Sequence, residues 1–134
     1  MERWLNVLLA KPKMDKLIKA ETKYIRTSPR KLRLIADAVR SLKPSQAIEQ
    51  LQFVNKRAAE ALNKTIKSAI ANAVNNFKLK AENLTFKEIK INEGPTLKRW
   101  QAASRGRAHR ILKRTSHIIV TLQAKVEAEN GTKS

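Results

Sequence analysis

One segment of the chain, residues 93–117, lacks the apolar side chains that a protein core requires. Its inner part, residues 98–114, contains seven lysine and arginine side chains and no acidic one. The few apolar residues among them are scattered, so the segment cannot bury itself, and an isolated hairpin of this kind is only marginally stable in water. A long insertion without its own core in a small domain usually has a function. We therefore expect a contact outside the chain to hold this segment in place.

The charge of the whole chain indicates what that contact is. Its 134 residues include 29 Lys and Arg against 11 Asp and Glu, a formal net charge of +18. Such an excess repels itself in the compact state and is tolerable beside a polyanion. The length is that of a single domain, and a hydrophobic fraction of 42% still permits a core, which excludes a disordered basic arm. We expect the partner to be a nucleic acid.

The rare residues exclude most kinds of active site. The chain has no cysteine, and its three glycines leave no room for a glycine-rich phosphate loop. The two histidines, His109 and His117, would lie about 26 Å apart on one extended strand, so they cannot share a metal ion. We expect His117 to pack or to form a hydrogen bond at the start of its strand. The acidic residues show no spacing typical of a general acid–base pair, and we predict no enzyme activity, metal or cofactor.

Helical periodicity occurs in three successive stretches between residues 28 and 77. The first begins at Ser28, whose hydroxyl can accept an unpaired N–H as a helix cap, and Pro29 suits the first helical position. The second begins at Ser45 and the third after Asn55, with apolar residues at three- and four-residue intervals. The side chains that we expect to be buried are Leu32, Ile35, Val39 and Leu42 in the first helix, Ala47, Ile48, Leu51 and Val54 in the second, and Ala58, Leu62, Ile66, Ala69, Ile70, Ala73, Val74 and Phe77 in the third.

Alternating apolar residues predict strands at residues 22–25, 84–91 and 117–122. In the second of these, Leu84 and Phe86 have one parity and Ile89 and Ile91 the other, which predicts a β-bulge near residues 87–88. The last two strands can pair antiparallel, with an extended hairpin over about 91–116 between them. We predict an α+β fold in one domain over residues 21–122: a three-stranded antiparallel sheet packed against three helices, with a protruding β-hairpin.

The two ends of the chain are expected to lie outside this domain. We interpret residues 1–20 as an N-terminal helical extension with a break at Pro12 and a second, basic turn containing Met14, Leu17 and Ile18. A targeting peptide is disfavoured because the apolar run is broken at Asn6 and no small-residue cleavage site follows it. Residues 123–134 are expected to form a polar tail. No stretch approaches the length of about 18 apolar residues that a membrane span needs.

Two basic clusters are candidate nucleic-acid contacts. The planar fork of arginine suits bidentate contacts to phosphate, and Trp100 can stack on an unpaired base. The alternative for the first cluster is a solvated loop with Trp100 folded back onto the sheet. The second cluster occupies a helix start, where cations are unfavourable unless an anion docks there; its alternative is a surface kept basic for solubility. The candidate RNA-binding residues are Lys98, Arg99, Trp100, Arg105, Arg107, His109, Arg110, Lys113 and Arg114 in the first cluster, and Lys23, Arg26, Arg30, Lys31 and Arg33 in the second.

Five blocks of the sequence, in order between about residues 21 and 122, closely resemble the large-subunit ribosomal protein 22 family. The blocks are residues 24–31, 56–59, 68–73, 93–99 and 106–118. The resemblance implies a non-enzymatic ribosomal protein that binds large-subunit rRNA, bridges its domains and binds early in subunit assembly. We expect a cytoplasmic ribosome, with the ribosome of an organelle as the alternative.

The resemblance also implies a place for the hairpin. In the family, the globular part sits near the outer end of the polypeptide exit tunnel. The hairpin reaches inward and lines the tunnel beside ribosomal protein 4, in contact with the nascent polypeptide. The positions of this sequence that match the tunnel-lining tip are Gln101, Ala102, Ala103, Ser104, Arg105 and Gly106.

Two departures from the family pattern limit what carries over. Family tips commonly have a basic residue or Met, then Pro, Arg and Ala, where this chain has residues 101–104. This tip is less basic and less rigid, so we carry over no expectation about drug contacts or nascent-chain stalling. Residues 1–20 also exceed the short start expected of bacterial members.

Two other functions compete with the ribosomal one. A free nucleic-acid binder, such as a chromosome-compacting protein or an RNA chaperone, would favour a dimerising face or a reading helix. We expect the apolar stripes of this chain to pack into one core instead, and we expect no homo-oligomer. A membrane-active cationic protein would carry its basic residues on one amphipathic helix, whereas here they lie on a strand, a hairpin and a helix start. We predict a structural protein embedded in RNA.

Overall fold

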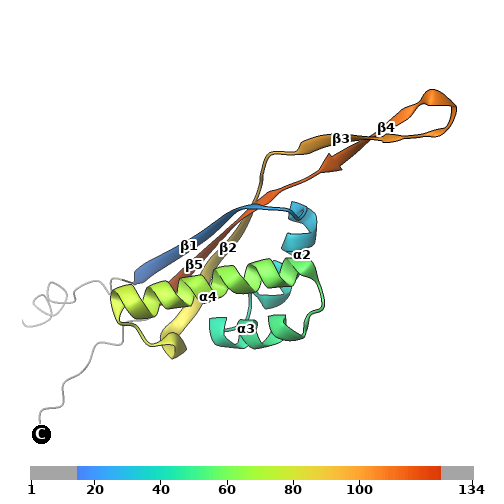
Figure 1. Cartoon of the computed structure of the whole chain (residues 1–134). Helices are drawn as coiled ribbons and strands as arrows, with labels where there is room; N and C mark the ends of the chain where they lie inside the picture. Colours follow the sequence, from blue (N-terminus) through green and yellow to red (C-terminus); the bar gives the residue numbers. More distant parts are fainter. Residues whose placement is uncertain (1–14, 125–134) are drawn as a thin grey trace, which may run out of the picture.

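The computed structural model describes residues 15–124 and has two parts, a helix-covered sheet and a hairpin that projects from it (Figure 1). This arrangement confirms the predicted α+β fold with its protruding hairpin. The elements in chain order are β1 (Lys16–Ile25), α2 (Pro29–Val39), α3 (Pro44–Phe53), α4 (Arg57–Phe77), the 3-10 turn η1 (Ala81–Asn83), β2 (Leu84–Glu93), β3 (Leu97–Ala102), the 3-10 turn η2 (Ser104–Gly106), β4 (Ala108–Lys113) and β5 (Ser116–Ala124).

The main sheet is antiparallel, with strand order β1-β5-β2. On the central strand, Ile118, Val120 and Leu122 are fully buried, and the side chains between them are half-buried. All three helices cover the same face of this sheet, which explains why one parity of the strand is the more deeply buried (Figure 1). The register of β2 against β5 shifts between Phe86 and Glu88, which confirms the predicted bulge.

The sheet extends further toward the N-terminus than the sequence indicated. The strand β1 begins at Lys16, which pairs with Ala124, so the prediction of a helical turn around Leu17 and Ile18 is wrong. Lysine, alanine and glutamate dominate this stretch and have low β-propensity, but pairing with β5 decides the conformation. The remainder of the predicted N-terminal helix, in residues 1–14, and the polar tail from residue 125 lie outside the described residues. Residues 123 and 124 belong to β5.

The start of α2 agrees with the prediction in place but not in its hydrogen bonding. Pro29 occupies the first turn and Ser28 the cap position, yet the Ser28 side chain makes no capping bond. The Ser28 carbonyl instead accepts the Leu32 N–H at 3.3 Å, which is the first bond of the helix. Of the predicted stripe, Leu32, Ile35 and Val39 are buried, whereas Leu42 lies beyond the end of α2 and is only partly buried.

The burial predicted for the outer ends of α3 and α4 is wrong. Val54, Val74 and Phe77 are about two-fifths exposed, and Ile48 and Ile70 are only partly buried. At 3.6 residues per turn, Val74 lies about 120° from the middle of the buried stripe of α4, so it cannot face the sheet. Small residues make the close contact with the sheet instead: Ala58, Ala59, Ala69 and Ala73 are all buried on this helix.

Candidate nucleic-acid interface

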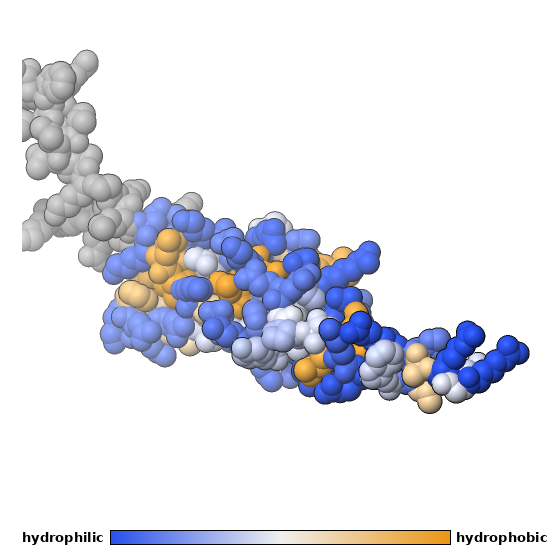
Figure 2. Space-filling model, turned by 90° about the horizontal axis from the view of Figure 1, so that it is seen from above, coloured by the Kyte–Doolittle hydropathy of each residue, from blue (hydrophilic) through white to orange (hydrophobic). Residues whose placement is uncertain are grey.

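The strands β3 and β4 form their own two-stranded sheet, separate from the main one. No side chain from Leu97 to Arg114 is buried, which confirms that this hairpin has no core of its own. In the space-filling view it forms a narrow, largely hydrophilic projection from the more apolar globular part (Figure 2). Its predicted RNA-binding side chains are therefore all open to a partner.

Trp100 lies on the hairpin and not against the main sheet. It is 68% exposed and pairs with Arg110, whose guanidinium carbon lies 6.0 Å from the centroid of the indole ring. Within the hairpin, the indole ring therefore makes a cation–π contact with Arg110. The alternative in which Trp100 folds back onto the sheet is wrong, because β3 stands away from the globular part (Figure 1).

The tip of the hairpin closes through left-handed backbone. Arg105 and Gly106 have φ of 58° and 68°. The Ala103 N–H donates to the Arg107 carbonyl at 2.7 Å and completes the loop. Glycine is the residue that adopts this conformation without a steric penalty, whereas Arg105 carries some strain. Of the predicted tip, residues 103–106 lie in this turn, whereas Gln101 and Ala102 are the last residues of β3.

A set of partly buried hydrogen bonds joins the hairpin to the globular part; we call Gly94, Pro95, Thr115 and Ser116 the neck. The Gly94 N–H donates to the Thr115 carbonyl at 2.9 Å, and the Thr115 hydroxyl donates to the Pro95 carbonyl at 2.6 Å. The Ser116 hydroxyl, fully buried, donates to the carbonyl of Thr27 at 2.6 Å. A Cβ on Gly94 would lie 2.5 Å from the Thr115 hydroxyl, so any other residue would displace that hydroxyl. The neck therefore fixes the hairpin to the loop between β1 and α2.

His117 completes this junction as predicted. Its Nδ1 accepts the Tyr24 backbone N–H at 3.0 Å, and the two rings meet edge to face with centroids 4.9 Å apart. Tyr24 has a φ of 57° within a register shift of β1, so the strand bends where it passes the neck. Between residues 15 and 124, no group of His, Asp and Glu side chains is arranged to hold a metal ion.

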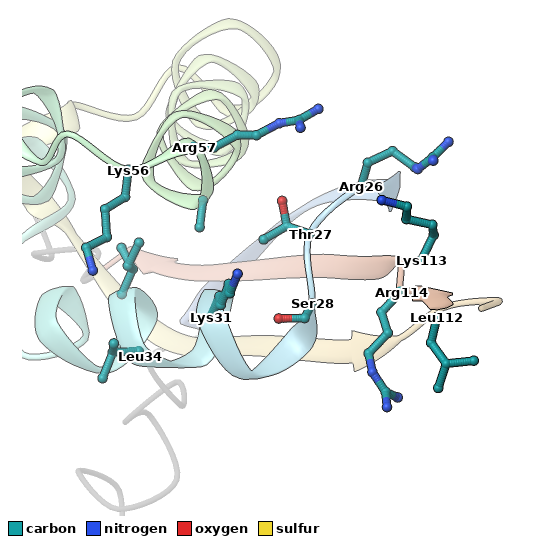
Figure 3. Close-up of a pocket in the computed structure, with 12 residues that line it drawn as sticks. Arg26, Thr27, Ser28, Lys31, Leu34, Lys56, Arg57, Leu112, Lys113 and Arg114 are labelled. Atoms are coloured by element: carbon teal, nitrogen blue, oxygen red, sulfur yellow. The ribbon is translucent and has the colours of Figure 1, made fainter. Parts of the chain in front are cut away.

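At the base of the hairpin, three parts of the fold enclose a cleft of about 930 Å³ (Figure 3). One wall is the junction of β1 and α2, the second is the start of α4, and the third is the end of β4. We call this space the basic cleft. Six of its lining residues are cations and none is acidic; the cations are Arg26, Lys31, Lys56, Arg57, Lys113 and Arg114.

The cleft brings together residues from both predicted clusters. Arg26 and Lys31 belong to the second cluster and Lys113 and Arg114 to the first, and the neck holds them around one space. Lys23 and Arg30 are exposed but do not line the cleft. Arg33 donates to the Ile91 carbonyl at 3.2 Å, so part of its hydrogen-bonding capacity ties α2 to β2.

Lys56 and Arg57 line the cleft but are not among the predicted binding residues. The signal was present: two adjacent cations stand immediately before the buried stripe of a helix, as Arg30 and Lys31 do at the start of α2. Neither helix has a side-chain cap, and the first turn of α2 has no acidic residue. The unpaired N–H groups and the positive ends of both helix dipoles therefore add to the cations, and the cleft favours an anion.

No helix within residues 15–124 is long and apolar enough to cross a membrane.

The acidic side chains of the globular part are exposed and spread over its surface. Three ion pairs form there, and all are solvent-accessible; they are Lys19–Glu21, Arg40–Asp37 and Lys64–Glu60. None of these pairs lies in the hairpin, so its positive charge is not neutralised within the described part of the chain.

Comparisons with known proteins agree with this geometry. The family pattern of ribosomal protein L22p/L17e matches residues 20–123. Among similar proteins is large ribosomal subunit protein uL22 of Mycoplasma capricolum, 49% identical over 104 residues that span 78% of this chain and 94% of the relative. The protein of the same name from Petrotoga mobilis is 51% identical over 107 residues, 80% of this chain and 72% of the relative. The one from Syntrophobacter fumaroxidans is 44% identical over 108 residues, 81% and 98% of the two chains. The chain thus belongs to the ribosomal protein L22p/L17e family, whose members are structural proteins and not enzymes.

Proposed function

We propose that this protein is a constituent of the large ribosomal subunit that binds the rRNA of that subunit in the cytoplasmic ribosome. The observation that carries the proposal is the hairpin: it buries no side chain, has no acidic residue from position 98 to 114, and projects from a well-packed domain. Such an element is only marginally stable alone, and a surrounding polyanion would neutralise its charge. The similarity to chains named as large ribosomal subunit proteins supports rRNA as that polyanion.

The separation of the charged regions supports a bridging role during assembly. The basic cleft lies at the base of the hairpin, and Arg105 and Arg107 lie at its tip. Strands of six residues place these sites roughly 20 Å apart. One protein can then neutralise phosphates of two RNA segments at once, and the neck keeps their separation constant. The mechanism is charge neutralisation combined with a fixed shape.

We further propose that the hairpin lines the polypeptide exit tunnel, beside ribosomal protein 4. A wall of such a tunnel needs an element that is narrow, extended and self-supporting in its backbone, and a two-stranded ribbon satisfies this. The tip residues Gln101, Ala102, Ala103 and Ser104 are small or uncharged and exposed or half-buried. They offer a nascent polypeptide a weakly interacting surface, while the cations on either side of them hold RNA.

The proposal is tested by sedimentation of tagged protein from a lysate through a sucrose gradient, first at moderate and then at high salt. We expect the protein to migrate with the large subunit and to resist the salt, because a hairpin enclosed by RNA cannot exchange its phosphate contacts one at a time. A protein that stays at the top of the gradient, or is stripped by salt, would favour a free RNA chaperone or a chromosome-compacting protein instead.

A variant without the hairpin separates binding from folding. Lys98 and Leu112 are paired across the strands, so residues 99–111 can be replaced by an Asn-Gly turn. We expect the thermal unfolding midpoint to change by only a few degrees, since the removed residues bury no side chain, and co-sedimentation at high salt to be lost. Unfolding of the domain, or undiminished co-sedimentation, would contradict the role assigned to the hairpin.

A further inference from the structure

The basic cleft contains a feature that a simple phosphate-binding surface does not need. Two of its lining residues are large exposed leucines, Leu34 on α2 and Leu112 on β4, which are 67% and 42% exposed. In Figure 3 they lie on different walls of the cleft, together with the cations of the same walls. Isolated exposed leucines are common on protein surfaces, but two of them among six cations form a mixed lining.

The shape of the cleft also limits what can enter it. A volume of about 930 Å³ is at the upper end of the range for pockets that bind small molecules, and a few nucleotides would fill it. An RNA double helix presents phosphates and riboses on a convex surface and hides the faces of its bases. Paired RNA placed here would leave the leucines against a charged backbone.

An unpaired nucleotide satisfies both parts of the lining. Its phosphates can contact the cations and the free N–H groups at the starts of α2 and α4, and its base offers a flat apolar face to a leucine or an arginine plane. We infer that the basic cleft binds a turn of unpaired RNA, such as a bulge, in preference to a double helix. This inference rests on the proposed function and names the form of RNA that the base of the hairpin recognises.

If unpaired RNA binds in the cleft, its cations and its leucines have different roles. Lys31 on α2 and Arg57 on α4 supply charge from facing walls of the cleft (Figure 3). Their contribution does not depend on whether the RNA is paired, because both forms carry phosphates. Leu34 and Leu112 contribute only where a base is free to leave its stack. Selectivity should therefore depend on the leucines and overall affinity on the cations.

The test compares two RNA hairpins that are identical except for a three-nucleotide bulge in the stem of one. Fluorescence anisotropy measures the affinity of the whole protein for each at the same salt concentration. We expect the bulged RNA to bind about tenfold more tightly, in line with the stacking of one base on a protein side chain. Equal affinities for the two RNAs would overturn the inference.

Variants assign the preference to the cleft. The double change Leu34→Ser and Leu112→Ser should reduce the preference to less than about threefold while the paired RNA binds as before. Lys31→Ala with Arg57→Ala should weaken binding of both RNAs by a similar factor. The matched control is Leu17→Ser, since Leu17 is 50% exposed on β1 and is not among the cleft residues. A preference that survives the double leucine change would overturn the inference as well.

The anisotropy experiment and the sedimentation experiment test different claims, so the inference and the proposed function can fail separately. The sedimentation experiment with the unaltered protein reports ribosomal association, whichever form of RNA the cleft prefers. Salt-resistant co-sedimentation together with equal affinity for paired and bulged RNA would leave the proposed function intact and refute this inference alone. Failure to bind either RNA and failure to co-sediment would refute both.

Discussion

The helix-covered sheet and the hairpin use the same kind of antiparallel strand pairing, yet they bury their side chains in opposite ways. In the sheet, β5 has five of its nine residues buried, whereas β3 and β4 have none. The sheet gains its stability from apolar contacts within the chain. The hairpin keeps only backbone hydrogen bonds and a few side-chain contacts, such as the one between Trp100 and Arg110.

This difference shows which part of the molecule depends on a partner. Apolar burial contributes about 25 cal/mol per Å², so a ribbon with no buried residue has little to offset the entropy of ordering its chain. The hydrogen bonds of the neck hold the first residues of the hairpin in place against the sheet. Beyond the neck, we expect bound RNA to supply the missing contacts.

The largest effect is expected when the same substitution, isoleucine to alanine, is made in the sheet and in the hairpin. Ile118→Ala removes a fully buried side chain from β5 and should lower the free energy of unfolding by about 2–5 kcal/mol. Ile111→Ala removes a half-buried side chain from β4 and should lower it by less than about 1 kcal/mol. Denaturant unfolding of both variants measures this. Similar losses for the two would mean that the hairpin is part of the cooperative core.

A second pair of substitutions tests where the rigid region ends. Gly94→Ala places a Cβ against the Thr115 hydroxyl, which must rotate away from Pro95, and we expect a loss of about 1–3 kcal/mol in unfolding free energy. Gly106→Ala introduces left-handed strain at the tip in open space, and global unfolding should change by less than about 0.5 kcal/mol. If the tip substitution proved the more costly in thermal unfolding, the assignment of the neck as the stabilised junction would be wrong.

The smallest expected effects concern single phosphate contacts. Arg107→Ala at the tip and Arg114→Ala in the cleft should each reduce the slope of log K against log salt concentration by about 0.7–0.9. Lys90→Ala is the control, because Lys90 lies on β2 between the buried Ile89 and Ile91 and so points to the face of the sheet away from the helices. Binding titrations with rRNA fragments over a range of salt measure the slope. An unchanged slope for both arginine variants would remove them from the phosphate contacts.

Much of the fold could be predicted because its signals are local. The bulge in β2 follows from a change of parity between Phe86 and Ile89, and the start of α2 follows from Ser28 and Pro29. The N-terminal half of β1 could not be predicted, because Lys16, Lys19 and Glu21 are poor strand formers on their own. Their conformation depends on hydrogen bonds to β5, more than 90 residues later in the chain.

The candidate site also has one part that could be predicted from local sequence signals and one part that could not. The exposed, basic hairpin could be predicted from the sequence, because a long run of cations without acids or a regular apolar stripe cannot form a core. The basic cleft could not be, because it needs residues 26, 31, 57 and 114 to meet, and no local pattern relates them. Arg57 is absent from the predicted residues for this reason, although it stands at a helix start as Arg30 does.

By itself, the sequence determined that this protein has one apolar core, an excess of positive charge and a hairpin that cannot fold around itself, since composition and periodicity are properties of neighbouring residues. Only the tertiary structure decided how the charges converge. The partly buried hydrogen bonds of Thr115 and Ser116 hold the hairpin against the β1–α2 loop, and packing of α4 on the sheet places its first turn opposite them. Convergence of distant residues depends on contacts of long sequence separation, and these are established only when the whole domain folds.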